Sequence, residues 1–327
     1  MRIEALITNR RNNRDAYMDL VYEWEDEFKK ALNVPFWYER NYRGKRIVMK
    51  CLDCFPFMSF LVRTSKCAFL FEMSDYRTDC LLNEKNFVSC VVDFYLNESL
   101  ESFVNKHNRN RILFVTSRQA YDFLSAKNMP FVVEHLPISL PTKYKIKLET
   151  KLEKKYQLII AGRPNPVLNS YVEEYAKRYP DFVYVKRMIQ DGHYIYMTSR
   201  EEIIGSADSR EEFLGLLRQA KVGLYTTSGM DNDKEQTNGY HQVTPRFLEL
   251  LACGCHVIAR YERNSDTDFF QMNDYWPSVD SYEQFECQLN KCLSKDPDME
   301  FYSNYLSKHY TIERIRKMQS VIAGIEG

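Results

Sequence analysis

Two charged residues, Arg246 and Glu249, stand inside an otherwise apolar stretch, residues 241–261. Thr244 and Pro245 precede them and predict a helix start, because a threonine oxygen can accept from the free amides of the first turn and proline's fixed φ suits the first helical position. Arg246 and Glu249 are three apart and share one helical face, beside free amides that favour an anion such as a phosphate. The spacing predicts an anion site, although the two could also simply pair on a helix surface, where such pairs contribute about 0.2 to 0.5 kcal/mol.

The rest of this stretch supplies the elements that hold the two charges. Most of the short helix is predicted to be buried by its apolar residues, which are Phe247, Leu248, Leu250, Leu251 and Ala252. Gly254 provides the backbone conformation needed just past a helix end, and the letters HVIARY that follow are typical of a buried strand.

This stretch resembles the nucleotide-sugar glycosyltransferases of the GT-B fold, in the broad group 1 (family four-like) class. The residues that carry the resemblance are Arg246, Phe247, Glu249, Leu250, Leu251, Ala252, Cys253, Gly254, Val257 and Ile258. In that family the glutamate holds the ribose hydroxyls of the nucleotide, and the helix start, here Thr244 and Pro245, faces the diphosphate. The usual pattern has another glutamate eight positions earlier, where this sequence has His241. Some branches lack that acid and show an Arg-x-x-Glu pattern instead.

The same resemblance implies further residues of a donor site. Residues 156–166 (YQLIIAGRPNP) predict a buried strand that runs into Gly162 and Arg163 at the carboxyl edge of a sheet. Gly162 permits close backbone approach there, and a Gly-Arg at this place contributes a cationic clamp on the donor phosphates. A later strand ends in small residues that the resemblance places beside the donor, namely Thr227, Ser228 and Gly229.

Three residues are the candidates for catalysis. Glycosyl transfer needs the developing charge of the leaving diphosphate stabilised, which preorganised cations can do without a metal, and Arg163 and Arg246 are the cations expected there. His241 would hydrogen-bond a hydroxyl of the donor sugar or the acceptor, or is an ordinary surface residue. Residues 230–242 form a long, charged connection, which is either a lid over the donor-sugar pocket or disordered.

The first half offers candidates for acceptor binding. Arg10, Arg11 and Arg14 follow the first predicted strand, and they either hold a phosphate of the acceptor through paired donors or form an exposed basic turn. A reaction with inversion would need a general base in this half. Asp53 or Asp93 could be proposed, and no spacing favours either.

Composition limits the class of protein. The 327 residues are 44% hydrophobic and 14% aromatic, which is ample for about two globular domains. The first 155 residues hold 26 lysines and arginines against 20 acidic residues, and the remainder holds 19 against 25, so the halves carry +6 and −6. The first half therefore faces something anionic or has a solvated charged surface, and nothing specific indicates nucleic acid.

We expect a cytoplasmic protein with reduced thiols. No stretch approaches the roughly 18 apolar residues of a membrane span, and Met1 and Arg2 are not followed by a signal-peptide core. Nine cysteines, mostly in apolar segments, favour buried thiols over a disulfide framework. Cys51 and Cys54 form one CxxC without a second pair, which favours a structural role over a zinc site.

Strand-like and helix-like pieces alternate along the chain, which predicts an α/β fold with largely parallel sheets. The expected strands of the first half are residues 2–8, 46–50, 67–73, 88–96 and 111–117, and its expected helices are 15–32, the run after Phe55, 100–105 and 119–126. Prolines in residues 131–141 and lysines in 142–155 indicate a linker. The predicted domains are an acceptor-binding Rossmann-like domain, 1–150, and a donor-binding one, 151–327. By resemblance to GT-B enzymes they face each other across a cleft, and the terminal helix, 311–325, crosses back onto the first.

The sequence therefore predicts a metal-independent glycosyltransferase that uses a UDP- or GDP-sugar as co-substrate and has no other cofactor. The resemblance implies a retaining reaction on a glycan or lipid-linked acceptor, in surface polysaccharide synthesis, with peripheral contact at the inner membrane face. One alternative is a non-catalytic subunit that binds a sugar nucleotide or glycan. Another is a sugar-nucleotide epimerase or hydrolase of similar fold.

Overall fold

The chain forms two compact units in the computed structural model, which describes residues 2–11, 13, 16–38, 67–73, 87–96, 98–108, 110–162, 164–190, 193–232 and 234–325. Unit 1 comprises Met1–Pro141 and Thr311–Gly327, and unit 2 comprises Thr142–Tyr310. The division lies at residue 141 rather than near 150, because the apolar side chains of Leu136, Ile138 and Leu140 are buried in unit 1.

Unit 1 is built on a parallel sheet whose strand order is β2-β1-β3-β4-β5-β6. Its strands are β1 (Ala5–Thr8), β2 (Phe36–Tyr38), β3 (Ala68–Glu72), β4 (Phe87–Val91), β5 (Asn110–Val115) and β6 (Val132–His135). The predicted strand 46–50 and the predicted helix after Phe55 lie outside the described residues. The order reverses between β1 and β3, as it does at the switch point of a doubly wound sheet.

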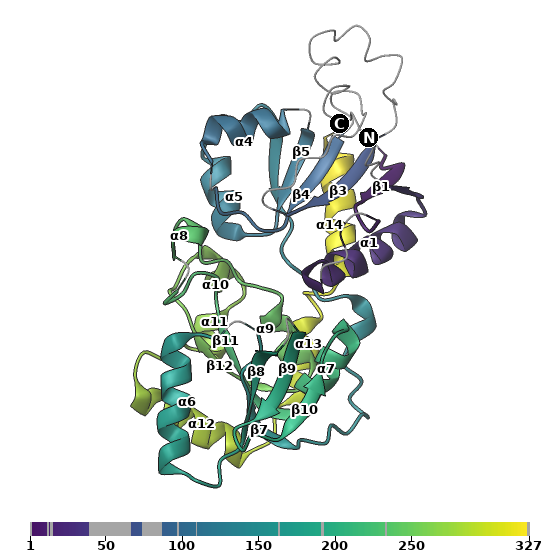
Figure 1. Ribbon diagram of the computed structural model, residues 1–327. Helices are drawn as coiled ribbons and strands as arrows, with labels where there is room; N and C mark the ends of the chain where they lie inside the picture. The colour runs from purple at the N-terminus through teal and green to yellow at the C-terminus, as the bar shows by residue number, and fades with distance from the viewer. Residues whose placement is uncertain are drawn as a thin grey trace, which may run out of the picture. The chain divides into compact units, whose positions relative to one another are not determined.

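The described helices of unit 1 are η1 (Ala16–Met18), α1 (Asp19–Leu32), α4 (Leu100–His107), α5 (Arg118–Ser125) and α14 (Thr311–Gly324). Helix α14 packs beside α1 (yellow and purple in Figure 1), so the prediction that the terminal helix crosses back to the first domain is confirmed. It is fixed there by Arg314, whose Nε donates to the carbonyl of Pro137 at 2.8 Å and whose Nη2 donates to that of Ile138 at 3.2 Å. Residues 311–327 therefore belong to unit 1 and not to a domain 151–327.

Unit 2 is built on a second sheet, in the order β10-β9-β8-β7-β11-β12. Its strands are β7 (Tyr156–Ile159), β8 (Tyr184–Gln190), β9 (His193–Thr198), β10 (Ile203–Ser206), β11 (Ala220–Thr226) and β12 (His256–Arg260). β8, β7, β11 and β12 are parallel, whereas β8, β9 and β10 form an antiparallel edge that the sequence did not predict. The switch point lies between β7 and β11, where the order reverses.

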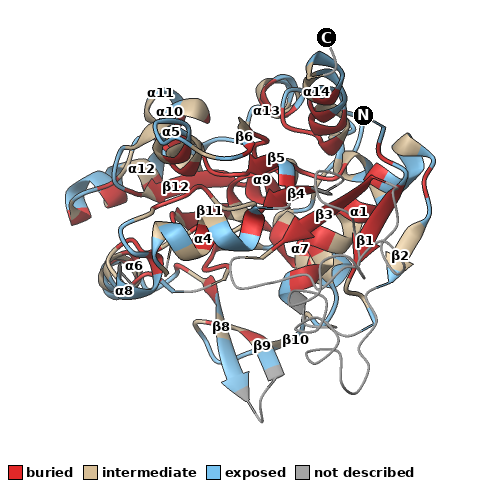
Figure 2. Ribbon diagram, turned by 90° about the horizontal axis from the view of Figure 1, so that it is seen from above, coloured by how far each residue is buried: buried red, intermediate tan, exposed pale blue. Residues whose placement is uncertain are grey.

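The helices of unit 2 cover both faces of this sheet (Figure 1). They are η3 (Thr142–Tyr144), α6 (Pro166–Arg178), α7 (Arg210–Arg218), α8 (Lys234–Thr237), α9 (Arg246–Ala252), α10 (Ser265–Phe269), α11 (Met272–Tyr275), α12 (Tyr282–Ser294) and α13 (Met299–Leu306). One core cluster joins β7 and β11 to α6 and α12 through Leu158, Val222, Val172 and Phe285. The parallel strands β11 and β12 are mostly buried, whereas the antiparallel edge is more exposed, with Ile189, Tyr194 and Ile203 open to solvent. The far end of β8 is coloured as exposed in Figure 2.

Candidate functional site

Helix α9 carries Arg246 and Glu249, the two charged residues of the predicted anion site, and it packs directly on β11. A glycine in that strand allows the approach, because a Cβ at Gly223 would lie 2.3 Å from Cδ2 of Leu250. Four apolar residues of α9 are fully buried, as predicted, namely Phe247, Leu248, Leu250 and Leu251, whereas Ala252 is half-buried. Phe247 contacts the Trp276 ring edge-on at 5.0 Å between centroids. Gly254 has φ +63° just past the helix, which confirms its predicted role.

The start of α9 differs from the prediction. Pro245 is the N-cap residue and already has helical backbone angles, φ −55° and ψ −24°, with no side-chain capping bond. The backbone N–H of Thr244 donates to the Tyr225 hydroxyl at 2.9 Å, and the Thr244 carbonyl accepts from Phe247 N–H at 3.2 Å. The threonine thus contributes its carbonyl rather than its hydroxyl to the first turn.

Glu249 lies between two arginines. Its Oε1 is 2.6 Å from Nη1 of Arg210, the first residue of α7, and its Oε2 is 2.9 Å from Nε of Arg246. Burial raises the pKa of the Glu249 carboxyl, but the two guanidiniums outweigh burial and hold that pKa below its ordinary value. The cluster therefore has two positive charges and one negative charge, a surplus of one positive charge.

Arg246 presents one side of its guanidinium to the end of β7. The group stacks on the Phe213 ring at 4.1 Å, and a Cβ at Gly162 would lie 3.7 Å from its Nη1. That Nη1 is a buried atom with no hydrogen-bond partner among the described residues. Gly162 has φ +91°, a conformation that favours glycine, so the backbone can pass close to the cation. A buried donor of this kind is costly unless a ligand satisfies it.

A second polar atom without a partner lies at the end of the neighbouring strand. Thr227 follows β11 directly and is buried, and its Oγ1 has no hydrogen-bond partner in the described part of the chain. The carboxyl ends of β7 and β11 meet at one edge of the sheet, which is the switch point where ligands of such folds bind. The site combines a cation, a hydroxyl and close backbone, and is suited to an anion.

A family model described as glycosyl transferase-like matches residues 154–319, slightly more than half of the chain. This chain belongs to the glycosyl transferase-like family. The matched region contains every described part of the site, from β7 to α9. It also contains residues 241–258, on which the sequence resemblance rested, so that resemblance is confirmed. Among curated protein sequences, none matches.

Solved structures of similar fold include AviGT4, a glycosyltransferase involved in avilamycin A biosynthesis. It is 9% identical, with 98% of this chain and 96% of that chain covered and a TM-score of 0.54. A TarM variant from S. aureus, in complex with fondaparinux, alpha-GlcNAc-glycerol and UDP, is 12% identical, with 82% and 57% covered and a TM-score of 0.53. The pneumococcal O-GlcNAc transferase GtfA, in complex with UDP and GlcNAc, is 14% identical, with 87% and 61% covered and a TM-score of 0.49.

This glycosyl transferase-like chain thus spans about three fifths of the length of GtfA and TarM. At such low identities the likeness to AviGT4 and TarM concerns the fold. The prediction of an α/β protein of the GT-B class, with two Rossmann-like sheets, is confirmed.

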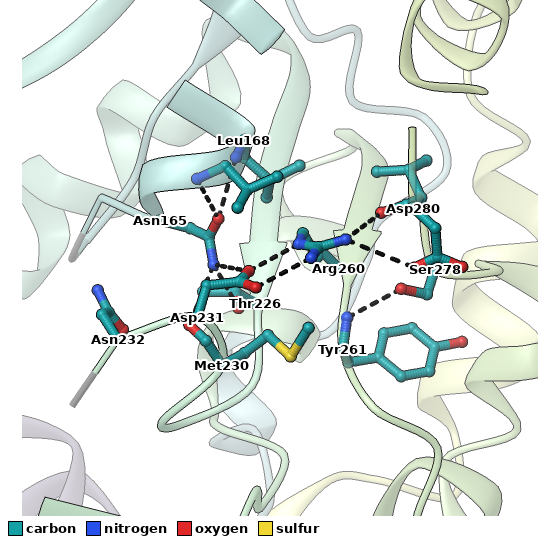
Figure 3. Close-up of polar contacts among 12 residues, drawn as sticks. Asn165, Leu168, Thr226, Met230, Asp231, Asn232, Arg260, Tyr261, Ser278 and Asp280 are labelled. Atoms are coloured by element: carbon teal, nitrogen blue, oxygen red, sulfur yellow. Dashed lines mark hydrogen bonds and ion pairs between the residues drawn. The ribbon is translucent and has the colours of Figure 1, made fainter. Parts of the chain in front are cut away.

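The connection after β11, predicted as a lid or as disorder, is pinned to the sheet by Asp231 (Figure 3). Its carboxylate accepts from Arg260 Nε at 2.6 Å and Nη2 at 2.9 Å, and from Asn165 Nδ2 at 2.8 Å. Asn165 also caps α6 by accepting from Leu168 N–H at 2.9 Å. This network orders the start of the connection, which also contains helix α8. A lid movement stays a prediction.

Three further predicted site residues, His241, Ser228 and Gly229, lie at the two ends of this connection. His241 is 8% exposed, and its Nδ1 lies 2.9 Å from the Ser228 carbonyl oxygen, so it is not an ordinary surface residue. Its Nε2 is 3.7 Å from Oε2 of Glu262. Gly229 has φ +73°, and a Cβ there would lie 2.2 Å from Oγ1 of Thr237. His241 therefore holds the chain that follows Thr227, and its contact with a donor sugar or acceptor stays a prediction.

Some predicted residues cannot be assigned a place. Arg163, Arg14, Cys51, Asp53 and Cys54 lie outside the described residues. Over the ranges that are described, no group of three or more His, Cys, Asp or Glu side chains could hold a metal ion. In the same part of the chain, no helix has the length and apolar character needed to cross a membrane.

In unit 1, Arg10 is committed to carboxylates rather than open to an acceptor phosphate. Its Nε lies 2.9 Å from Oε2 of buried Glu25, and its Nη1 lies 2.7 Å from Oδ1 of Asp26. Arg11 instead stacks on the Tyr38 ring at 3.8 Å. The hypothesis that Arg10 binds a phosphate is therefore not supported by its contacts.

A buried acid and a buried histidine lie close together in unit 1. Oε2 of Glu72, the last residue of β3, is 3.6 Å from Nδ1 of His107 in α4. Burial raises the pKa of Glu72 to about 8 and lowers that of His107 to about 4. Both are therefore uncharged near neutral pH. Asp93, the candidate base that is described, follows β4, and its role stays a prediction.

The sequence missed three charged residues of the unit 2 site. Arg210, Asp231 and Arg260 come from different elements, and each finds its partner only in the folded chain. The one signal available for Arg210 was its place behind Ser209, which forms a capping box with Glu212 and marks the start of α7.

Proposed function

We propose that this protein transfers a glycosyl group from a nucleotide-sugar donor to a hydroxyl of a glycan or lipid-linked acceptor. The observation that carries the proposal is the Arg246 guanidinium, whose buried Nη1 lacks a partner among the described residues and faces Gly162 at the switch point of unit 2. A donor diphosphate would satisfy that cation. Membership of the glycosyl transferase-like family supports this chemistry over other anion-binding roles.

The site would act on the bond between the anomeric carbon and the diphosphate. As this bond breaks, its electrons pass to the diphosphate oxygen, and the acceptor oxygen forms the new bond and gives its proton to the leaving diphosphate. Arg246 would stabilise the charge that grows on the leaving group, and the Thr227 hydroxyl would donate to the same group. Arg163 is proposed as a second cation. We propose retention at the anomeric carbon, following the family branch that the sequence resembles.

We propose UDP- or GDP-sugars as donors, with UDP tested first, because the fold is shared with TarM, which is described in complex with UDP. The surplus of basic residues in the first 155 positions, 26 against 20 acidic ones, supports an anionic acceptor or membrane surface as its partner. The proposed setting is the cytoplasmic face of the inner membrane, in surface polysaccharide synthesis.

Calorimetric titration with UDP, GDP, ADP and CMP tests the donor site. We expect one nucleotide to bind, and Arg246→Ala to weaken it by about tenfold to a hundredfold, as expected for a lost charge-assisted hydrogen bond. Arg263→Ala is the matched control, since the Arg263 side chain in the same unit is 73% exposed and pairs only at the surface with Asp268. Binding that is absent, or equal in the Arg246 variant, would contradict the proposal. Sugar nucleotides of the base that binds are then tested for transfer.

A second candidate is a non-catalytic subunit that binds a sugar nucleotide. The observation in its favour is His241, which stands where the family pattern has a glutamate and whose Nδ1 lies 2.9 Å from the Ser228 carbonyl oxygen. Nucleotide binding without sugar transfer to any glycan or lipid-linked acceptor would support this candidate. Release of free sugar, or an altered donor, would instead indicate a hydrolase or an epimerase.

A further inference from the structure

We infer that Glu249 is a positioning residue, which holds the Arg246 guanidinium towards the donor diphosphate instead of binding the nucleotide ribose, and that Arg210 completes the arrangement. This inference rests on the proposed function. It assigns a role to Arg210, and it changes the role that the sequence resemblance implies for Glu249.

The first argument is that both carboxylate oxygens already have a cationic partner. Arg210 Nη1 lies 2.6 Å from Oε1, and Arg246 Nε lies 2.9 Å from Oε2. The Glu249 side chain is only 3% exposed. The contact between Oε2 and Nε is an ion pair without hydrogen-bond geometry. A ribose hydroxyl would nevertheless have to reach a buried carboxylate that two guanidiniums already contact.

The second argument is the way in which Arg246 is held. Nε faces Glu249, the face of the guanidinium rests on Phe213 at 4.1 Å, and Nη1 is directed to Gly162. A planar guanidinium fixed at one edge and one face has its remaining donors in a set direction. Such fixed donors stabilise developing charge without reorganisation during the reaction.

The third argument concerns charge. Glu249 and Arg246 alone would form a neutral pair, which attracts a diphosphate weakly. Arg210 adds a second cation to the same carboxylate, so that the cluster keeps one surplus positive charge for an anion. Arg210 itself is held as the first residue of α7, with its guanidinium 5.5 Å from the centre of the Tyr144 ring.

The test compares inorganic pyrophosphate with the nucleoside diphosphate that binds the wild-type protein, in wild type and in Glu249→Gln. The glutamine raises the net charge of the cluster, which by itself would strengthen the binding of an anion. A misplaced Arg246 is expected to have the opposite effect, a loss of about tenfold or more for both ligands. In a double-mutant cycle, Arg246→Ala should then cost little more in the Glu249→Gln background.

The outcomes separate this inference from the proposed function. If the variant binds pyrophosphate as well as or better than wild type while the nucleoside diphosphate weakens, Glu249 contacts the ribose and the inference is overturned, but the donor site stands. If wild type binds neither ligand, both fail. Thermal melting, with Arg263→Ala as the control, shows whether Glu249→Gln folds. If it does not fold, the inference is tested with Arg210→Gln and Arg210→Lys instead. The inference requires weaker pyrophosphate binding with glutamine and recovery with lysine, and unchanged binding with glutamine overturns it.

Discussion

Replacing Gly223 with alanine should destabilise unit 2 and displace the helix that carries the site. The new Cβ would lie 2.3 Å from Cδ2 of Leu250, 3.1 Å from Cδ1 and 3.2 Å from Cγ. Leu250 is fully buried, and in a close-packed interior a shift of its side chain that clears the new Cβ also displaces its neighbours. We therefore expect the strand and the helix to move apart.

The expected magnitude follows from two opposing effects. Overpacking of a close-packed core costs about 1–3 kcal/mol. Replacement of a glycine lowers the conformational entropy of the unfolded chain and contributes about 0.4–1 kcal/mol in the other direction. A contact as short as 2.3 Å places Gly223→Ala at the upper end of the cost. We expect a net loss of about 2–2.6 kcal/mol, with a fall in the melting temperature of about 2–4 °C for each kcal/mol.

Gly215→Ala is the matched control. Gly215 lies inside helix α7, where a Cβ would meet no atom within 4 Å. Alanine should stabilise this helix by about 0.5–1 kcal/mol. Thermal and urea unfolding of both variants measure the difference, and nucleotide titration of folded Gly223→Ala should show weakened binding because Arg246 moves with α9. A Gly223→Ala protein as stable as wild type would refute the close-packing argument.

Two further changes test the network after β11 and the buried acid of unit 1. Asp231→Asn should speed the proteolysis of residues 227–242, because it removes the negative charge that Arg260 contacts twice. The control is Asp268→Asn, which changes an exposed ion pair and should lower the free energy of unfolding by less than about 1 kcal/mol. The pKa of Glu72 is raised from 4.5 to about 8, so the folded state binds its proton more tightly and stability falls as pH rises through that window. His107 has the opposite effect, because burial lowers its pKa to about 4, but this effect ends above pH 6.5, the ordinary pKa of histidine. Glu72→Gln should therefore make the free energy of urea unfolding less dependent on pH between about pH 6.5 and 8. An unchanged slope would contradict the assignment.

The sequence predicted the features that depend on neighbouring residues. Helix α9 and strand β12 follow from local apolar patterning, and Gly254 follows from the need for positive φ after a helix. The alternation of helices and strands gave the α/β class and the carboxyl edge of β7 as a binding place. These predictions needed no knowledge of distant contacts.

The remaining features depend on residues that meet only after folding. Arg210 reaches Glu249 because α7 and α9 lie against the same strand, β11, and no spacing in the sequence indicates this. The antiparallel edge β8-β9-β10 was missed because residues 193–206 were not predicted to form strands, and the direction of a partner strand depends on contacts that form only on folding. The domain boundary was misplaced because a run of prolines and lysines indicated a linker, although Leu140 is buried in unit 1.

The discontinuous course of unit 1 affects the order of events during synthesis. Unit 2 is one continuous run, Thr142–Tyr310, and has all its strands once that run has left the ribosome. Unit 1 needs α14 as well, since Met318 and Ile322 are buried in it and Arg314 satisfies two of its carbonyls. Domains usually fold in the order in which they are made. Here the unit that is begun first is completed last, and a released chain that ends at residue 310 would contain all of unit 2 but an incomplete unit 1.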